Sequence, residues 1–314
     1  MLHLRLITPA DRTDEVVRLI ETTVGTAHLI VMTGAARNPA GDVVMCDVAR
    51  EAGDELIGAL RQLGLDRTGS IAVDDIGLSL SDRADRAEED APGEGADAVL
   101  WEHLADATHE ESTLSVTYVA FLTVATMLAA CGVMLDNAIL IVGAMAVGPE
   151  FGPLAGISTA LVRRAPRLVW RSLWALLAGF AAAMVLTVGF SWLLDAFGLF
   201  EKSMVQAARP NTAFIWKPDW MSFVVAFLAG IAGTLSLTSA KSGALIGVAI
   251  SVTTVPAAAN AAVAFSYRDY SQTWGSSWQL LANLGGIVAA GTLTLLAQKA
   301  FWAWQRERTT AQLT

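Results

Sequence analysis

The pattern of apolar and polar positions changes at residue 111 and divides the chain into two parts. In the first part, apolar residues alternate over short stretches or recur at helical spacing, as in half-buried strands and amphipathic helices. The pattern predicts strands over 2–8, 27–33, 42–49 and 69–76 and helices over 12–24 and 51–63. This βαββαβ order is the split βαβ, ferredoxin-like arrangement. We therefore expect an α+β domain over residues 1–77.

The second part contains six apolar segments, each at or above the roughly 20 residues that a helix needs to cross the hydrocarbon core of a bilayer. These segments run over 114–135, 138–162, 168–194, 220–239, 243–264 and 279–303. Residues 114–314 are thus expected to form a polytopic α-helical membrane domain of six spans.

Two stretches connect these parts. Residues 78–97 are acidic and contain proline and glycine, which predicts a flexible linker. Residues 98–113 gather apolar residues on one helical face and carry Trp101, so they predict an interfacial elbow helix on the membrane.

Composition and charge agree with a membrane protein. The chain is 54% hydrophobic and 16% charged, with a mean hydropathy of +0.49, whereas soluble proteins are about 25% charged. Residues 1–111 hold 9 basic and 23 acidic residues, and residues 112–314 hold 12 and 7. A chain of net charge −9 lacks the basic surface that nucleic acid requires, so the expected partner is the lipid bilayer. Its two cysteines form no metal-ligand spacing with histidine, and we expect neither a metal nor another cofactor.

The basic residues predict the orientation of the membrane domain. Eight follow the second, fourth and sixth segments, and four lie at the opposite ends. By the positive-inside rule the first group is cytoplasmic. The start of the chain also lacks the basic region and apolar stretch of a signal peptide. We therefore expect a multi-pass protein of the cell inner (plasma) membrane with cytoplasmic N- and C-termini.

The second and fifth segments resemble each other. Each has a polar start, branched apolar residues ahead of glycine, and proline near the middle of the span. A 3+3 inverted repeat with broken second and fifth helices is typical of secondary transporters, because broken helices free backbone groups to line a cavity. We expect the break of the second segment at Gly148-Pro149-Glu150-Phe151-Gly152-Pro153, since two glycines and two prolines in six residues hardly continue a helix. At Pro256 of the fifth segment a simple kink is the alternative.

Glu150 is the only acidic residue deep in any of the six segments. A carboxylate there is costly, so the side chain faces a water-filled cavity, pairs with a base, or carries a proton. An ion- or proton-binding role is the functional hypothesis. The alternative is a neutral glutamate whose hydrogen bonds hold the broken helix closed.

Further polar residues lie near the middle or the ends of these segments. The fifth segment has mid-span hydroxyls at Ser251, Thr253 and Thr254, which are either partners of Glu150 or bonded back to their own helix. For gating or lipid contact the candidates are Asp136, Asn137 and Lys241, with helix caps and boundary residues as the alternative.

At Leu135 to Pro153, and again at Lys241 to Pro256, the sequence resembles an uncharacterised hydrophobic domain family of prokaryotic membrane proteins, domain of unknown function 389. The run Gly143-Ala144-Met145 followed by paired prolines carries the resemblance. The family commonly has leucine and methionine between those prolines, where this chain has Glu150 and Phe151. The resemblance implies a membrane protein and no particular activity.

Two functions fit these patterns. The first is a membrane transporter or channel for a small solute or ion, with a pathway between the broken second and fifth helices and a cytoplasmic regulatory or oligomerising domain. The second is a membrane-anchored sensor whose soluble domain binds a small ligand. An enzyme is not expected, because the spans contain no grouping of catalytic residues. The unpaired face of the N-terminal sheet makes a homo-oligomer the expected assembly.

Overall fold

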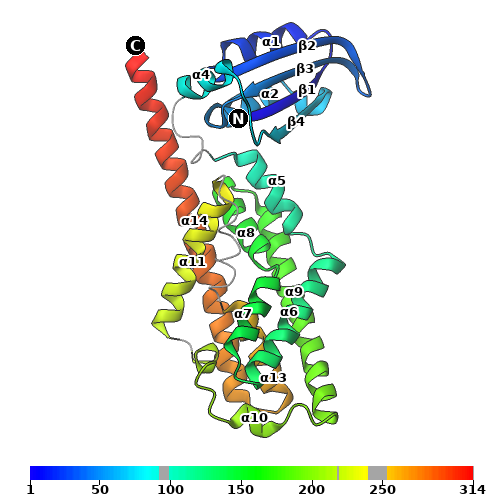
Figure 1. Ribbon diagram of the computed structural model, residues 1–314, viewed down its shortest axis with the longest axis vertical. Helices are drawn as coiled ribbons and strands as arrows, with labels where there is room; N and C mark the ends of the chain where they lie inside the picture. The colour runs from blue at the N-terminus through cyan, green and yellow to red at the C-terminus, as the bar shows by residue number, and fades with distance from the viewer. Residues whose placement is uncertain (92–98, 218, 240–252, 314) are drawn as a thin grey trace. The chain divides into compact units, whose positions relative to one another are not determined.

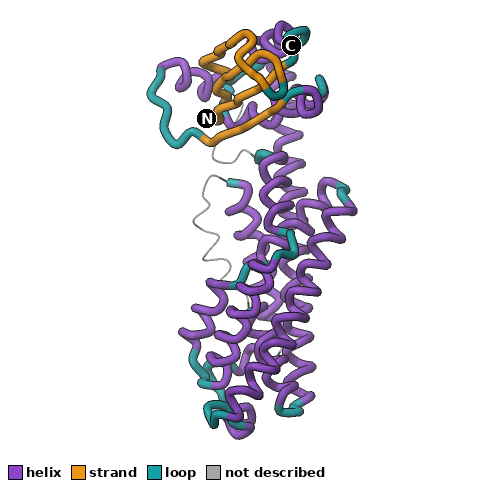
Figure 2. Tube along the Cα trace, turned by 90° about the vertical axis from the view of Figure 1, so that its right-hand side faces the viewer, coloured by secondary structure: helices purple, strands orange, loops and turns teal. Residues whose placement is uncertain are grey.

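The protein is described from a computed structural model that covers residues 1–91, 99–217, 219–239 and 253–313. The chain divides into two compact units. The N-terminal unit consists of Met1–His103 together with Thr238–Ala240 and Trp302–Thr314, and the helical unit consists of Leu104–Leu237 and Lys241–Phe301. Figure 1 labels the elements of both units, and Figure 2 shows that the strands belong to the N-terminal unit.

The N-terminal unit contains one four-stranded antiparallel sheet of order β2-β3-β1-β4. The strands are β1 Leu2–Thr8, β2 Thr26–Arg37, β3 Ala40–Val48 and β4 Ser70–Asp75. The helices are α1 Thr13–Thr22, α2 Arg50–Gln62 and the short α3 Leu65–Thr68. In this order α1 joins β1 to β2, and α2 with α3 joins β3 to β4, so each connection crosses a strand that lies between. The split βαβ order expected from the sequence is present.

The core of this unit follows from the alternation along β1. Leu2, Leu4 and Leu6 point to one face and are buried, and they pack with Leu56 and Leu60 of α2. Side chains two apart lie on the same face of a strand, so one apolar series is enough to fix the helix-covered face. Each buried leucine contributes about 1.5–3 kcal/mol of burial free energy.

The acidic stretch after the sheet corrects one expectation. Residues 78–97 were predicted as a flexible linker, but helix α4, Asp82–Asp90, occupies nine of them and contacts β2 and β3. Ser81 caps the helix by accepting a hydrogen bond of 3.2 Å from the backbone N–H of Arg83. Ala84 and Ala87, three residues apart, are buried. The high charge concealed this helix, because its few apolar residues are alanines on a single face. Residues 92–98 lie outside the described part of the chain.

The helical unit contains several helices that are long and apolar enough to cross a membrane. Within the described residues these are α6 Val116–Met134, α9 Pro166–Ala196, α11 Trp220–Thr238 and α14 Tyr270–Leu313. Helices α7 Ala138–Val147 and α8 Phe151–Arg163 form a further pair, bent by 53° at a short break. By length and composition, the described residues thus give four candidate spans, or five if the bent pair is one span, which is compatible with a membrane-embedded protein.

The remaining expected spans are partly described. Helix α13, Thr254–Ser266, is the second half of the expected fifth span, and its first half falls on residues outside the described part. Helix α14 begins nine residues before the expected start at 279. The early turns of α14 carry polar residues that interrupt the apolar pattern, yet Gln272, Ser276 and Gln279 are buried in the protein.

Tryptophans mark the two ends of α9. Trp170 and Trp192 are 70% and 58% exposed. They are 22 residues apart, which at 1.5 Å per residue corresponds to about 33 Å. The hydrocarbon core of a bilayer is about 30 Å thick, and tryptophan is enriched at both of its interfaces. This spacing is therefore the one expected of a helix that crosses the whole bilayer.

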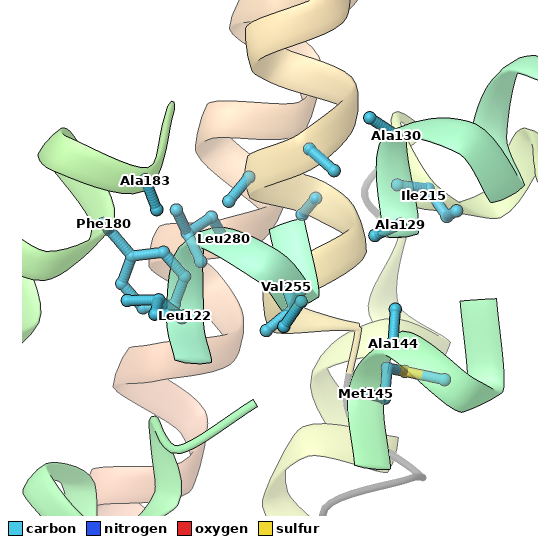
Figure 3. Packing of buried hydrophobic residues seen from close by; sticks show 14 of the residues in the cluster. Leu122, Ala129, Ala130, Ala144, Met145, Phe180, Ala183, Ile215, Val255 and Leu280 are labelled. Carbon is cyan, nitrogen blue, oxygen red and sulfur yellow. The ribbon is translucent and has the colours of Figure 1, made fainter. Parts of the chain in front are cut away.

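Small residues bring the helices of the second unit close together. A Cβ atom built on Gly179 of α9 would lie 2.6 Å from the ring of Tyr118 on α6, and one on Gly230 of α11 would lie 2.7 Å from the carbonyl oxygen of Ile287 on α14. Helix α13 packs against α6, α7 and α9. Figure 3 shows part of the resulting apolar cluster, including Leu122 of α6 and Val255 of α13. Close packing through small residues is the usual basis of helix association in membranes.

Candidate functional site

The site lies at the break between α7 and α8. Gly148 ends α7, and Glu150 precedes the first residue of α8. The break is shorter than expected, because Gly152 and Pro153 belong to α8 as its second and third residues. Proline is tolerated in the first turn of a helix, where its missing N–H would have no partner within the helix. The sequence run therefore marks a helix start and not a longer irregular segment.

The Glu150 side chain is 5% exposed and points to the fifth segment. Its Oε1 accepts a hydrogen bond of 2.5 Å from the hydroxyl of Thr254, the first residue of α13. Its Oε2 is buried and accepts no hydrogen bond from the described residues. A Cβ atom on Gly148 would lie 2.3 Å from Oε2 and 2.9 Å from Val255. Glycine at 148 is thus what allows the carboxyl group to occupy this position.

Helices α8 and α13 begin in the same way. Thr253 stands immediately before α13 as Glu150 does before α8, and Pro256 is the third residue of α13 as Pro153 is of α8. Each helix N-terminus carries a partial positive charge of about half an elementary charge. The Glu150 carboxyl group lies at the N-terminus of its own helix and reaches that of α13. Among the described residues, no basic side chain forms an ion pair with this carboxyl group.

Two amide side chains of α14 complete the site, and the sequence analysis missed both. Asn283 donates a hydrogen bond of 3.0 Å from Nδ2 to the hydroxyl of Thr253, and Gln279 donates one of 3.1 Å from Nε2 to Oδ1 of Asn283. Both amides are buried, and Oε1 of Gln279 accepts no hydrogen bond from the described residues. Their spacing of four residues places them on one face of α14. That spacing was the signal in the sequence, but both residues fall inside the expected sixth segment and neither was singled out.

Two neighbouring cavities reach this site. One of about 220 Å³ is lined by Phe214, Asp219, Met221, Ser222, Val225, Ala226, Thr253 and Asn283. The other, of about 280 Å³, is lined by Asp219, Trp220, Ser222, Phe223, Trp278, Gln279 and Ala282. Asp219 and Ser222 line both. A space between α11, α14 and the start of α13 therefore ends at Thr253, next to the residue that binds Glu150.

The other candidate residues are found in different settings. Thr253 and Thr254 reach the site, whereas Ser251 and Lys241 lie outside the described residues. Asn137 caps α7, since its Oδ1 accepts hydrogen bonds of 3.0 and 3.2 Å from the backbone N–H groups of the next turn. Asp136 accepts hydrogen bonds of 3.0 Å from the Asn211 amide and 2.8 Å from the Thr212 hydroxyl. Asp136 thus fastens the segment between α9 and α11 to the start of α7.

Arg209 in that same segment is a buried basic residue that the sequence analysis did not single out. Its guanidinium group donates a hydrogen bond of 3.1 Å to Oδ1 of Asn260 on α13 and another to Oε1 of Gln272 on α14. Asn260 in turn donates a bond of 2.7 Å to Ser276. The arginine links the middle of α13 to the start of α14, away from Glu150 along α13.

Part of the chain is similar to a family of known sequences, and this part contains the site. Residues 145–289 match the Domain of unknown function (DUF389). This match confirms the resemblance found in the sequence, and the DUF389 segment contains Glu150, Thr254 and Asn283. It leaves out Asp136, Asn137 and the N-terminal unit.

An uncharacterized protein of Methanocaldococcus jannaschii is similar to this chain, with 24% identity over 169 residues. The alignment covers 54% of this chain and 50% of the relative, so the chain spans about half the length of the protein it matches. No solved structure matches the chain. Neither the DUF389 description nor the relative names an activity.

Proposed function

We propose that the protein is a membrane transporter or channel for a small solute or ion, with its pathway between the broken second and fifth helices. One observation carries the proposal. Glu150, at the break between α7 and α8, is hydrogen-bonded to Thr254 at the start of α13. Helix starts that meet inside the apolar part of a membrane protein are costly unless they line a pathway, because their backbone groups need polar partners.

The cavities add a second line of support. They connect the start of α11 to Thr253 and Asn283 through residues that include hydroxyl, amide and carboxyl groups. A buried polar group costs free energy unless it is hydrogen-bonded, and here Oε2 of Glu150 and Oε1 of Gln279 lack a partner among the described residues. Gln279 lines a cavity, and Glu150 is bonded to Thr254, the neighbour of cavity-lining Thr253. Unpaired groups in this position suit a site that exchanges partners during transport. For this reason we favour transport over the sensor function.

We further infer the arrangement in which this pathway operates. Six spans in a 3+3 inverted repeat would place α8 and α13 on opposite sides of the midplane, and their equivalent prolines, Pro153 and Pro256, support this. The excess of basic residues after the second, fourth and sixth segments supports cytoplasmic termini. In this proposal the N-terminal unit lies in the cytoplasm of a prokaryotic cell, where it regulates or assembles a homo-oligomer in the inner membrane.

Flux through proteoliposomes tests this function. The purified protein is reconstituted, and uptake of a panel of labelled ions and small metabolites is measured across a range of pH values. We expect Glu150→Gln to lower the flux of the transported species at least about tenfold or to abolish its pH dependence, since the variant keeps the shape of the side chain but cannot ionise.

Glu201→Gln is the matched control, because Glu201 is exposed and, among the described residues, its carboxylate accepts one hydrogen bond, of 2.9 Å from the Ser203 hydroxyl. Its flux should equal that of the native protein. The proposal is wrong if no member of the panel crosses the membrane faster than through empty vesicles, or if Glu150→Gln keeps both the rate and the pH profile.

A further inference from the structure

The lining of the cavity of about 220 Å³ indicates which class of ligand it binds, because its charge is negative. Among the described lining residues of this cavity and of its neighbour, Asp219 is the only charged side chain. The next ionisable group is Glu150. It is hydrogen-bonded to Thr254, whose neighbour Thr253 lines the cavity. Both groups are acidic, and the described lining contains no basic side chain.

Asp219 is ionised under physiological conditions. Hydrogen bonds of 2.7 Å from the hydroxyl and the backbone N–H of Ser222 stabilise its carboxylate. These two bonds hold the pKa of Asp219 below its usual value. Its position before the first turn of α11 further favours the negative form. The cavity therefore has a fixed negative charge at one end.

The polar groups at the other end contribute hydrogen-bonding capacity. Thr253 and Asn283 line the cavity, and Gln279 lines its neighbour with Oε1 buried and unpaired within the described residues. An oxygen atom of this kind is an acceptor only. It fits a ligand that donates hydrogen bonds, and it repels an anion.

The walls between these ends are apolar. Phe214, Met221, Val225 and Ala226 form half of the lining. The volume corresponds to about seven water molecules at roughly 30 Å³ each. A bare divalent cation needs about six to eight oxygen ligands, and the described lining has four polar residues, of which Ser222 is already bonded to Asp219. Size and lining both favour an organic cation over a metal ion.

We propose that this cavity binds a small organic ammonium ion, with the cationic group beside Asp219 and Phe214 and the apolar part against Met221, Val225 and Ala226. An aromatic face attracts a cation in addition to the carboxylate. Ligands that carry N–H groups bind also to Thr253, which lines the same cavity. The inference rests on the proposed function in that it names the substrate class of the same pathway, yet binding at this site can be measured without any flux.

The test measures ligand-dependent thermal stabilisation of the full-length protein in detergent, since a ligand that binds only the folded state raises Tm. The probes are methylammonium chloride and tetramethylammonium chloride, with sodium chloride at equal ionic strength and neutral tert-butanol as comparisons. We expect concentration-dependent stabilisation by both ammonium ions and none by the other two at the same concentrations.

Three variants locate the effect. Asp219→Asn removes the charge but keeps the helix cap, because asparagine caps as well as aspartate, and it should raise the apparent Kd for both ammonium ions at least tenfold. Phe214→Leu should weaken tetramethylammonium several-fold and methylammonium less. Glu201→Gln should change neither.

Stabilisation by sodium chloride equal to that by the ammonium salts, stabilisation by tert-butanol equal to theirs, or an unchanged Kd in Asp219→Asn would each overturn the inference. Ammonium binding without flux in vesicles would leave this site in place and remove the transport function. Flux of an anion without ammonium binding would support the transport function and overturn the ammonium site.

Discussion

Glu150 is a buried carboxyl group placed between two helix N-termini, and its neighbour Gly148 makes the room for it. The glutamate could be found from the sequence, because a single acid in an otherwise uncharged span stands out. Its partners could not all be found in that way. Thr254 lies 104 residues along the chain and was one of three hydroxyl candidates, while Asn283 and Gln279 are of a residue type that is common near the ends of spans.

The close approach at Gly148 gives a prediction at this scale. Gly148→Ala puts a methyl group within 2.3 Å of Oε2 of Glu150 and 2.9 Å of Val255, so the carboxyl group must move from its hydrogen bond. We expect the free energy of unfolding to fall by about 1–3 kcal/mol, as for other overpacked sites, measured as a lower Tm in detergent.

Gly143→Ala in the same helix is the control, because nothing lies within 4 Å of its added Cβ atom. Alanine is favoured over glycine inside a helix by up to about 1 kcal/mol, so this variant should be as stable as the native protein or more so. Equal Tm values for Gly148→Ala and Gly143→Ala would contradict the packing described for the break.

At the scale of elements, the local pattern of apolar residues predicted the strands and the long helices. It failed where the buried face of a helix contains alanines or amides in a charged or polar stretch. The alternation of Leu2, Leu4 and Leu6 identified β1. Helix α4 was missed because the buried residues of its acidic sequence are two alanines. The start of α14 was missed for a related reason, since the buried Gln272 amide bonds Arg209 and the backbone of Val205 and not solvent.

The docking of α4 can be tested by burying a larger polar side chain. Ala84→Gln places an amide where alanine is 2% exposed, and an unpaired buried amide costs about 1–3 kcal/mol. We expect faster hydrogen exchange across residues 82–90 with little change in β1 and β3.

Arg86→Gln introduces the same residue on an exposed position of the same helix. Its exchange should match that of the native protein. If both variants exchange alike, α4 does not depend on its alanine face for docking.

At the scale of the whole molecule, the sequence predicted a membrane protein with a small α+β unit before it, and both features are present. The proposed inverted repeat rests on short sequence similarities between the two halves of the membrane part. In the structure, α8 and α13 share the position of a proline in their first turn, and the repeat stays a proposal. Spans are predictable from one chain because the bilayer demands about 20 apolar residues. Contacts between spans depend on small residues and single hydrogen bonds, which leave little pattern in the sequence.

The central claim is that a water-accessible pathway reaches the meeting point of α8 and α13. The most direct measurement is the reaction of a cysteine at Thr253, which lines the cavity, with a charged, membrane-impermeant thiol reagent. The native Cys46 and Cys131 are first replaced by serine, and Thr253→Cys is compared with Ala258→Cys, on a fully buried residue one turn further along α13. The account predicts that the cysteine at 253 is modified by the reagent and that the one at 258 is not. Protection of both positions in the folded protein, with modification of both after unfolding, would contradict it.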